Sequence, residues 1–152
     1  MAKTISTKKA KNILESQNLF ECDLTNSKGI ELLPYANSKN NAENVVLSAI
    51  MDYLARCSLV ASSWRNNVGA VKRENRFVRF GKEGQSDIIG FLTDGRFLAI
   101  EAKRGSGGKL TQKQLEFLQC VDAAGGVAII ASDVVDVINR LERERKAKYE
   151  QC

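Results

Sequence analysis

The sequence predicts an α/β domain in which a central mixed sheet is flanked by helices. Three observations support this fold class. Apolar residues recur with a helical period over residues 43–57, two strand-like runs flank an Asp94-Gly95 turn, and the order strand, helix, strand extends from Phe97 to Ala131. The last order predicts two parallel strands joined by a crossover helix. At 152 residues the chain is long enough for one domain with its own core.

Residues 1–39 are polar and only weakly periodic, and we assign them to an N-terminal arm. Pro34 and the asparagine-rich run at positions 37–41 mark its boundary, so the domain itself is expected to comprise residues 40–152. The arm is either an element for dimerisation or nucleic-acid contact, or a peripheral appendage. Its sequence leaves these interpretations open.

The composition favours an anionic partner and excludes histidine chemistry. Lys and Arg number 23 against 18 Asp and Glu, which gives a net charge of +5. The chain has no histidine, which removes Ser-His-Asp hydrolysis and His-based zinc sites. The four cysteines form no CxxC pair and predict reduced thiols. Because no apolar run is long enough to span a bilayer and no signal peptide is evident, we expect a cytoplasmic protein with no membrane partner.

The first predicted helix covers residues 43–57. Its apolar stripe is formed by Val46, Ile50, Tyr53, Leu54 and Cys57. Glu43 lies three residues before Val46, so its carboxylate is expected on the buried face, where a metal ligand would project across a sheet. A second interpretation is that Glu43 completes a capping box with Asn40 as the N-cap.

The next segment combines strands with basic residues. Residues 58–64 are strand-like, and the single Trp64 is expected in the core, with stacking on a base as the alternative. A turn-rich segment over residues 65–69 precedes a second, half-buried strand at Arg76 to Phe80. Four basic residues surround that strand: Lys72, Arg73, Arg76 and Arg79. Such a strand suits either a phosphate-facing surface or a solvated edge strand protected against aggregation.

The stretch from Gly84 to Lys103, GQSDIIGFLTDGRFLAIEAK, organises the rest of the chain as a predicted hairpin. A three-residue loop at positions 93–95 would place Asp87 opposite Glu101, with both acids and Lys103 on one face. A two-residue turn would shift the register by one and put Asp87 on the other face. The sequence leaves the register open, and a site built from both acids depends on it.

Beyond the hairpin, a flexible basic loop at positions 104–109 is expected to lead into a helix from Thr111 to Gly125. Gln114 should face the core, and the spacing Thr111-x-x-Gln114 is also a capping box, which explains the glutamine structurally. Residues 127–131 are fully apolar and predict an interior strand. A final helix is expected from Ser132 onward.

Two adjacent carboxylates favour a hard divalent cation. Asp87 and Glu101 would repel each other unless one is protonated or a cation bridges them. Oxygen ligands without histidine or cysteine suit Mg²⁺ or Mn²⁺, and no organic cofactor is indicated. Lys103 would then contact the phosphate or the attacking water, while Glu43 and Gln114 would complete or orient the ligand shell.

Several short segments occur in one order along residues 41–141. They are Glu43, Trp64-Arg65-Asn66-Asn67-x-Gly69, Arg79-Phe80-Gly81, Gly84-x-x-Asp87, Ile100-Glu101-Ala102-Lys103 and Leu110-Thr111-x-x-Gln114. In this combination the chain resembles the VRR-NUC (virus-type replication-repair nuclease) domain of the PD-(D/E)XK nuclease superfamily. The resemblance implies a restriction-endonuclease-like αβββαβα core. Ser86 stands where the superfamily name has proline.

The resemblance also implies a site. The acidic metal ligands of the family match Glu43, Asp87 and Glu101, joined by the backbone carbonyl of Ala102. The lysine and glutamine of the family match Lys103 and Gln114. The implied cofactor is Mg²⁺, with Mn²⁺ as a substitute.

Small stand-alone viral or phage members of this family are similar to homodimeric resolvases. The resemblance therefore implies a structure-selective endonuclease acting on branched or four-way (Holliday) junction DNA, as a homodimer in the host cytoplasm. DNA contacts are expected from Arg65, Asn66, Lys72, Arg73, Arg76, Arg79, Arg104 and Lys109. Two alternatives stay open: a non-catalytic DNA-binding module on a nuclease fold, and a sequence-specific restriction-type endonuclease.

Overall fold

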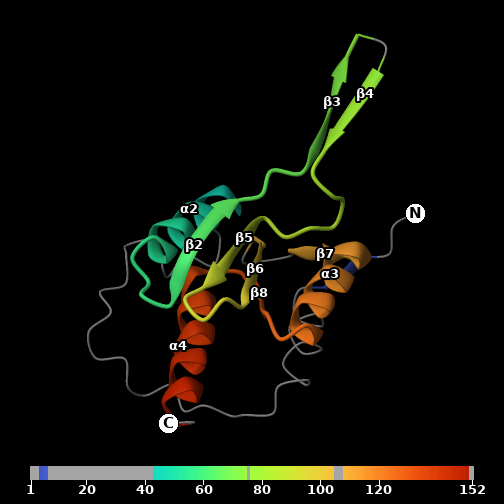
Figure 1. Ribbon diagram of the computed structural model, residues 1–152. Helices are drawn as coiled ribbons and strands as arrows, with labels where there is room; N and C mark the ends of the chain where they lie inside the picture. The colour runs from blue at the N-terminus through green and yellow to red at the C-terminus, as the bar shows by residue number, and fades with distance from the viewer. Residues whose placement is uncertain (1–3, 7–42, 75, 105–107, 151–152) are drawn as a thin grey trace.

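The computed structural model describes residues 4–6, 43–74, 76–104 and 108–150, without the side chains at positions 4, 5, 70, 72, 73, 77, 79 and 148–150 (Figure 1). The elements in chain order are β1 (Thr4–Ser6), α2 (Glu43–Leu54), β2 (Val60–Arg65), β3 (Gly69–Arg73), β4 (Arg76–Phe80), β5 (Ile88–Leu92), β6 (Phe97–Ala102), β7 (Lys109–Thr111), α3 (Gln112–Ala123), β8 (Val127–Ala131) and α4 (Val134–Glu150).

A four-stranded sheet in the order β2-β5-β6-β8 forms the centre of the domain. The β2–β5 and β5–β6 pairs are antiparallel, and β6 and β8 are parallel on either side of the α3 connection. Helices α2 and α4 cover one face of the sheet, while α3 covers part of the other (Figure 1). The prediction of an α/β domain with a mixed sheet flanked by helices is therefore confirmed.

Side-chain alternation along β6 separates the two halves of the core. Leu98 and Ile100 pack in the cluster beneath α2 and α4, whereas Ala99 packs in the cluster beneath α3. Since successive residues of a strand point to opposite faces, Glu101 belongs to the α3 face. Three residues of the predicted apolar stripe, Val46, Ile50 and Leu54, are at most 2% exposed. Tyr53 is half-buried, and the helix ends at Leu54, before the predicted end at Cys57.

The expected burial of Trp64 is wrong. Its side chain is 45% exposed, and its ring meets that of Phe91 edge-on, with the ring centroids 6.3 Å apart. Trp64 is paired with Ile89, which lies on the α3 side of the sheet. On that side α3 packs against β6 and β8, so the β2–β5 half is left uncovered.

The predicted strand at Arg76–Phe80 forms, but in a different setting. It pairs with β3, which the sequence did not predict, and the two strands make a separate hairpin outside the four-stranded sheet. The described side chains of β4, at Arg76, Val78 and Phe80, are all exposed, so the expectation of a half-buried strand is wrong.

Short strands β1 and β7 form a second small sheet. Thr4 pairs with Thr111, and Ser6 pairs with Lys109, where the sequence predicted only a flexible loop. Residues 4–6 of the predicted arm thus join the domain, and the rest of the arm, with Asn40, lies outside the described residues. In the part of the chain that the structure describes, no helix is long and apolar enough to cross a bilayer.

Candidate active site at the ends of β5 and β6

The β5–β6 register brings Asp87 and Glu101 together. Ile88 pairs with Ile100, and the Leu92 N–H donates to the Arg96 carbonyl at 2.9 Å across the turn. Gly95 has φ +87°, which is the left-handed conformation that a three-residue loop requires. Of the two registers that the sequence left open, the structure therefore has the one set by the three-residue loop. Continued by one residue, it places Asp87, immediately before β5, opposite Glu101.

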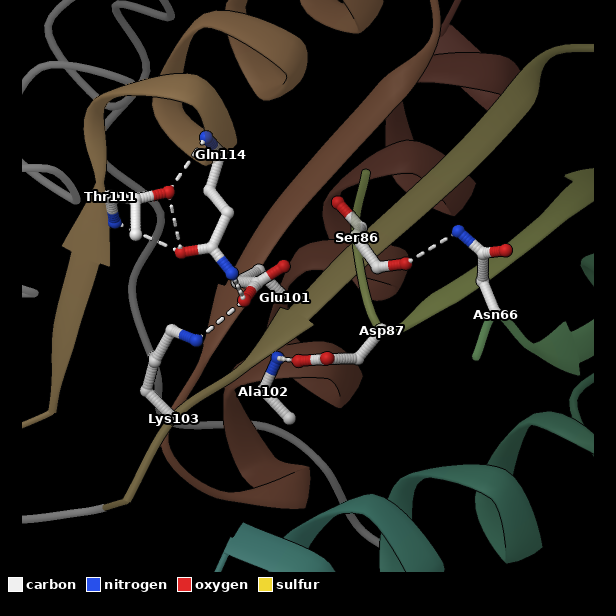
Figure 2. Close-up of polar contacts among 8 residues, drawn as sticks. All are labelled: Asn66, Ser86, Asp87, Glu101, Ala102, Lys103, Thr111 and Gln114. Atoms are coloured by element: carbon white, nitrogen blue, oxygen red, sulfur yellow. Dashed lines mark hydrogen bonds and ion pairs between the residues drawn. The ribbon is translucent and has the colours of Figure 1, made fainter. Parts of the chain in front are cut away.

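Glu101 is the centre of the polar cluster at this end of the sheet. Its side chain is 0% exposed, and Oε1 accepts from Lys103 Nζ and from Gln114 Nε2, each at 2.5 Å (Figure 2). Its other oxygen, Oε2, is buried and has no hydrogen-bond partner among the described residues. Burial and the neighbouring Asp87 carboxylate outweigh Lys103 and raise the pKa of Glu101 to about 7.

Lys103 is buried beside this carboxylate with 7% of its surface exposed. Its backbone N–H donates to the Ala131 carbonyl at 2.8 Å, which extends the β6–β8 ladder and holds the residue at the sheet. Burial alone would lower the pKa of Lys103, but Glu101, followed by Asp87 and Glu43, raises it on balance. The ammonium group is therefore charged at neutral pH.

Gln114 reaches the cluster from the first turn of α3. Its backbone N–H donates to Thr111 Oγ1, and its Oε1 accepts from the Thr111 N–H at 2.9 Å, so the predicted capping box is present. Its Nε2 simultaneously donates to Glu101. A glutamate at this position would cap the helix equally well but would have no N–H for Glu101. A glutamine rather than a glutamate at this position therefore indicates that the residue also donates a hydrogen bond, here to Glu101.

The segment before Asp87 is held from both sides. Asn66 Nδ2 donates to the Ser86 carbonyl at 3.1 Å (Figure 2). It also donates to Gln85 Oε1 at 3.3 Å, and the Asn66 N–H donates to the Asp87 carbonyl at 2.7 Å. The Asp87 carboxylate then accepts from the Ala102 N–H at 3.0 Å through Oδ2. The sequence did not predict these hydrogen bonds of Asn66, because Asn66 is 20 residues from Ser86 along the chain.

Gly84 explains the spacing Gly84-x-x-Asp87. Its φ is +88°, and a Cβ there would lie 2.7 Å from the Lys113 Cβ and 2.9 Å from the Lys113 carbonyl oxygen. Any larger residue would therefore push the segment off the first turn of α3. An ion pair of 2.6 Å between Lys113 and Glu83 joins the same two elements.

Glu43 does not lie where the sequence placed it. It is the first residue of α2, and its side chain is exposed rather than on the buried face. It lies near enough to raise the pKa of Lys103, but within the described ranges no group of three or more Asp, Glu, His or Cys side chains is arranged to hold a metal ion. Glu43 is exposed because it is the first residue of the helix, at the end of the buried stripe. Glu43 and the Ala102 carbonyl stay predicted ligands.

The remaining donors fit Mg²⁺. Glu101 offers a buried oxygen that has no hydrogen-bond partner in the described part of the chain, and Asp87 lies beside it. Both residues supply the hard oxygen ligands that this ion prefers. Burial first, and the neighbouring Asp87 carboxylate second, disfavour the charged form of Glu101 and raise its pKa to about 7 despite Lys103. A divalent cation held by Asp87 and Glu101 would stabilise the charged form of both carboxylates.

The predicted DNA-binding residues fall into three groups. Arg65, Arg76, Arg104 and Lys109 are exposed. Lys72, Arg73 and Arg79 occupy positions on the β3–β4 hairpin. Asn66 differs from both groups, because its side-chain amide donates hydrogen bonds within the chain.

Searches of protein-family models, of curated proteins and of solved structures find no match for this chain.

Proposed function

We propose that the chain is a Mg²⁺-dependent, structure-selective DNA endonuclease that hydrolyses phosphodiester bonds at branched or four-way junction DNA. The observation that carries this proposal is the fully buried Glu101 beside Asp87 and Lys103, with one oxygen that no described residue hydrogen-bonds. A buried carboxylate with a raised pKa next to a second acid is costly to the fold, and such groups cluster at functional sites.

Each residue then has a separate role. Asp87 and Glu101 hold Mg²⁺, which when bound polarises the phosphate and lowers the pKa of water. The Lys103 ammonium group lies beside Glu101 and supplies positive charge for the phosphate as negative charge grows on its oxygens. Gln114 fixes the orientation of the Glu101 carboxylate, and Asn66 fixes the segment that carries Asp87.

The substrate class follows from charge and from the resemblance to VRR-NUC domains. A net charge of +5 favours nucleic acid, and stand-alone members of that family act on branched DNA. We include a homodimer in the proposal. One site cuts one strand, so a two-fold pair would make symmetric nicks across a four-way junction.

The direct test uses labelled duplex, flap, splayed and four-way DNA in Mg²⁺, in Mn²⁺ and in EDTA. We expect cleavage that requires the metal and that favours the branched substrates. Cleavage of simple duplex at one motif, without preference for branches, would instead indicate a restriction-type enzyme. Absence of product from every substrate under both metals would contradict the nuclease assignment.

One observation favours a non-catalytic DNA-binding module as the second candidate. Lys103 already pairs with Glu101, and Glu43 is exposed, so the polar cluster also satisfies the description of a buried structural ion pair. Such a module would bind the four-way junction tightly and yield no product in Mg²⁺ or Mn²⁺. The same assay therefore separates the two candidates.

Replacing Asn66 by alanine is expected to lower the cleavage rate about tenfold and to change DNA affinity less than about twofold. The change removes two hydrogen bonds that hold the segment before Asp87, at a cost of about 1–2 kcal/mol in the free energy of unfolding. The matched control is Asn67→Ala, since Asn67 is the exposed neighbour. Single-turnover rates and binding in EDTA measure the two effects. Weaker binding with an unchanged rate would show that Asn66 contacts DNA instead.

A further inference from the structure

The β3–β4 hairpin extends away from the rest of the domain (Figure 1). Five backbone pairs, from Gly69 with Phe80 to Arg73 with Arg76, make a regular antiparallel ribbon. At the usual rise per residue each strand is about 17 Å long. Among the described elements, neither strand packs extensively against anything except the other. The ribbon is therefore free to enter a space outside the domain.

The exposed apolar side chains of the hairpin support the ribbon itself. The Phe80 ring lies over Gly69, so closely that a Cβ there would be 2.8 Å from a ring carbon. Val68 packs in the same way against Gly81, whose φ is +72°. Val71 and Val78 form a cross-strand pair in the middle of the ribbon. These contacts brace the stem, and none of them requires a second copy of the chain.

The charge of the ribbon points to a polyanion. Lys72, Arg73, Arg76 and Arg79 lie on it, and Glu74 is its single acid. Arg73 and Arg76 are paired directly across the strands at the tip. Two like charges opposite each other destabilise an isolated ribbon, whereas phosphate groups would offset the repulsion. The charges at the tip therefore favour a ribbon that is bound to nucleic acid over one that is exposed to solvent.

The stem of the hairpin is joined to the candidate active site at both ends. The chain enters through Asn66 and leaves through the segment that ends at Asp87, and hydrogen bonds join these two segments. DNA held along the ribbon would thus lie next to the segment that carries Asp87. The major groove of B-DNA is wide enough for a two-stranded ribbon.

We propose that the β3–β4 hairpin is a DNA-binding ribbon that enters the major groove of a duplex arm beside the one being cut. Its basic residues contact phosphates on both sides of the groove, so binding is independent of sequence. This inference rests on the proposed function and deepens it. A ribbon that needs a second duplex arm near the scissile bond gives the enzyme a physical reason to favour branched DNA over a single duplex.

The test is the double variant Arg73→Ala/Arg76→Ala, with binding to a four-way junction measured in EDTA. We expect affinity to fall about tenfold and the slope of log K against log salt to become shallower by about 2, one contact per arginine. The matched control is Arg143→Ala/Lys146→Ala, which removes the same charge from exposed positions on α4. Its affinity and salt slope should stay close to those of the unmodified chain. Circular dichroism and thermal unfolding establish that both variants fold.

Binding in EDTA separates this inference from the proposed function. If the unmodified chain binds but never cuts in Mg²⁺, the nuclease proposal fails while the hairpin result still stands. Equal affinity and equal salt slope for the hairpin and control variants would overturn the DNA-binding ribbon. A second result would also overturn it: unchanged affinity of the hairpin variant for DNA together with a lower molecular mass in sedimentation than that of the unmodified chain. The ribbon would then contact a second copy of the chain.

Discussion

Replacing Asp87 or Glu101 by alanine is expected to abolish cleavage, with a rate reduction of at least about 10³-fold, while binding of branched DNA persists. Both carboxylates would hold the metal ion, and within the described ranges no group of three or more Asp, Glu, His or Cys side chains is arranged to replace either of them. Single-turnover cleavage at saturating enzyme measures the chemical step. Gel-shift binding in EDTA measures affinity separately.

The controls distinguish lost chemistry from lost folding. Glu101→Gln preserves the shape of the side chain and removes its charge, so it should be as inactive as Glu101→Ala and closer to the parent in stability. Glu116→Gln makes the same exchange at an exposed position of α3 and should leave the rate unchanged. Mg²⁺-dependent cleavage retained by the Asp87 or Glu101 variants would contradict the assignment of the site.

The metal-free protein is expected to lose stability as pH rises from about 4.5 to about 7. Glu101 has a pKa near its ordinary value in the unfolded chain and about 7 in the fold, because burial and Asp87 disfavour its charge. Between these two values the folded state binds more protons than the unfolded state, so the free energy of unfolding decreases as pH increases. The loss amounts to about 3 kcal/mol. Denaturant unfolding in EDTA across this range measures it.

Metal and mutation should both change this pH dependence. Glu101→Gln cannot ionise, so its stability should vary less between pH 5 and 8 than that of the parent, by about 3 kcal/mol. Mg²⁺ binds the ionised carboxylate and should therefore stabilise the parent more at pH 8 than at pH 5.5. The Gln variant should gain little at either pH. An equally steep loss of stability in Glu101→Gln would show that another group titrates.

Local patterns predicted the elements on which the site is built. The helical period of Val46, Ile50 and Leu54 predicted a helix with one buried face, and that face is buried. Thr111 and Gln114 predicted the start of α3 through a capping box that is present. These signals depend on residues within one or two turns of each other, so they can be read without knowing the fold.

Predictions that depended on what covers a surface were wrong. Trp64 is exposed because α3 covers only part of its face of the sheet. Glu43 continues the buried stripe of α2 in spacing, yet its position at the first turn leaves it exposed. Strand β7 was missed because its partner β1 lies more than a hundred residues away in the chain, where no local signal links the two.

The sequence by itself reduced the relation of Asp87 and Glu101 to two hairpin registers, of which only the three-residue loop makes them neighbours. Gly95 permits the left-handed turn of that loop, and the structure has the register that goes with it. Only the tertiary structure decided how deeply Glu101 is buried and which residues hold the two acids in place. Helix α3 buries Glu101 and delivers Gln114 to it, and Asn66 holds the segment that carries Asp87. Burial is what raises the pKa of Glu101, and burial depends on elements that no local pattern brings together.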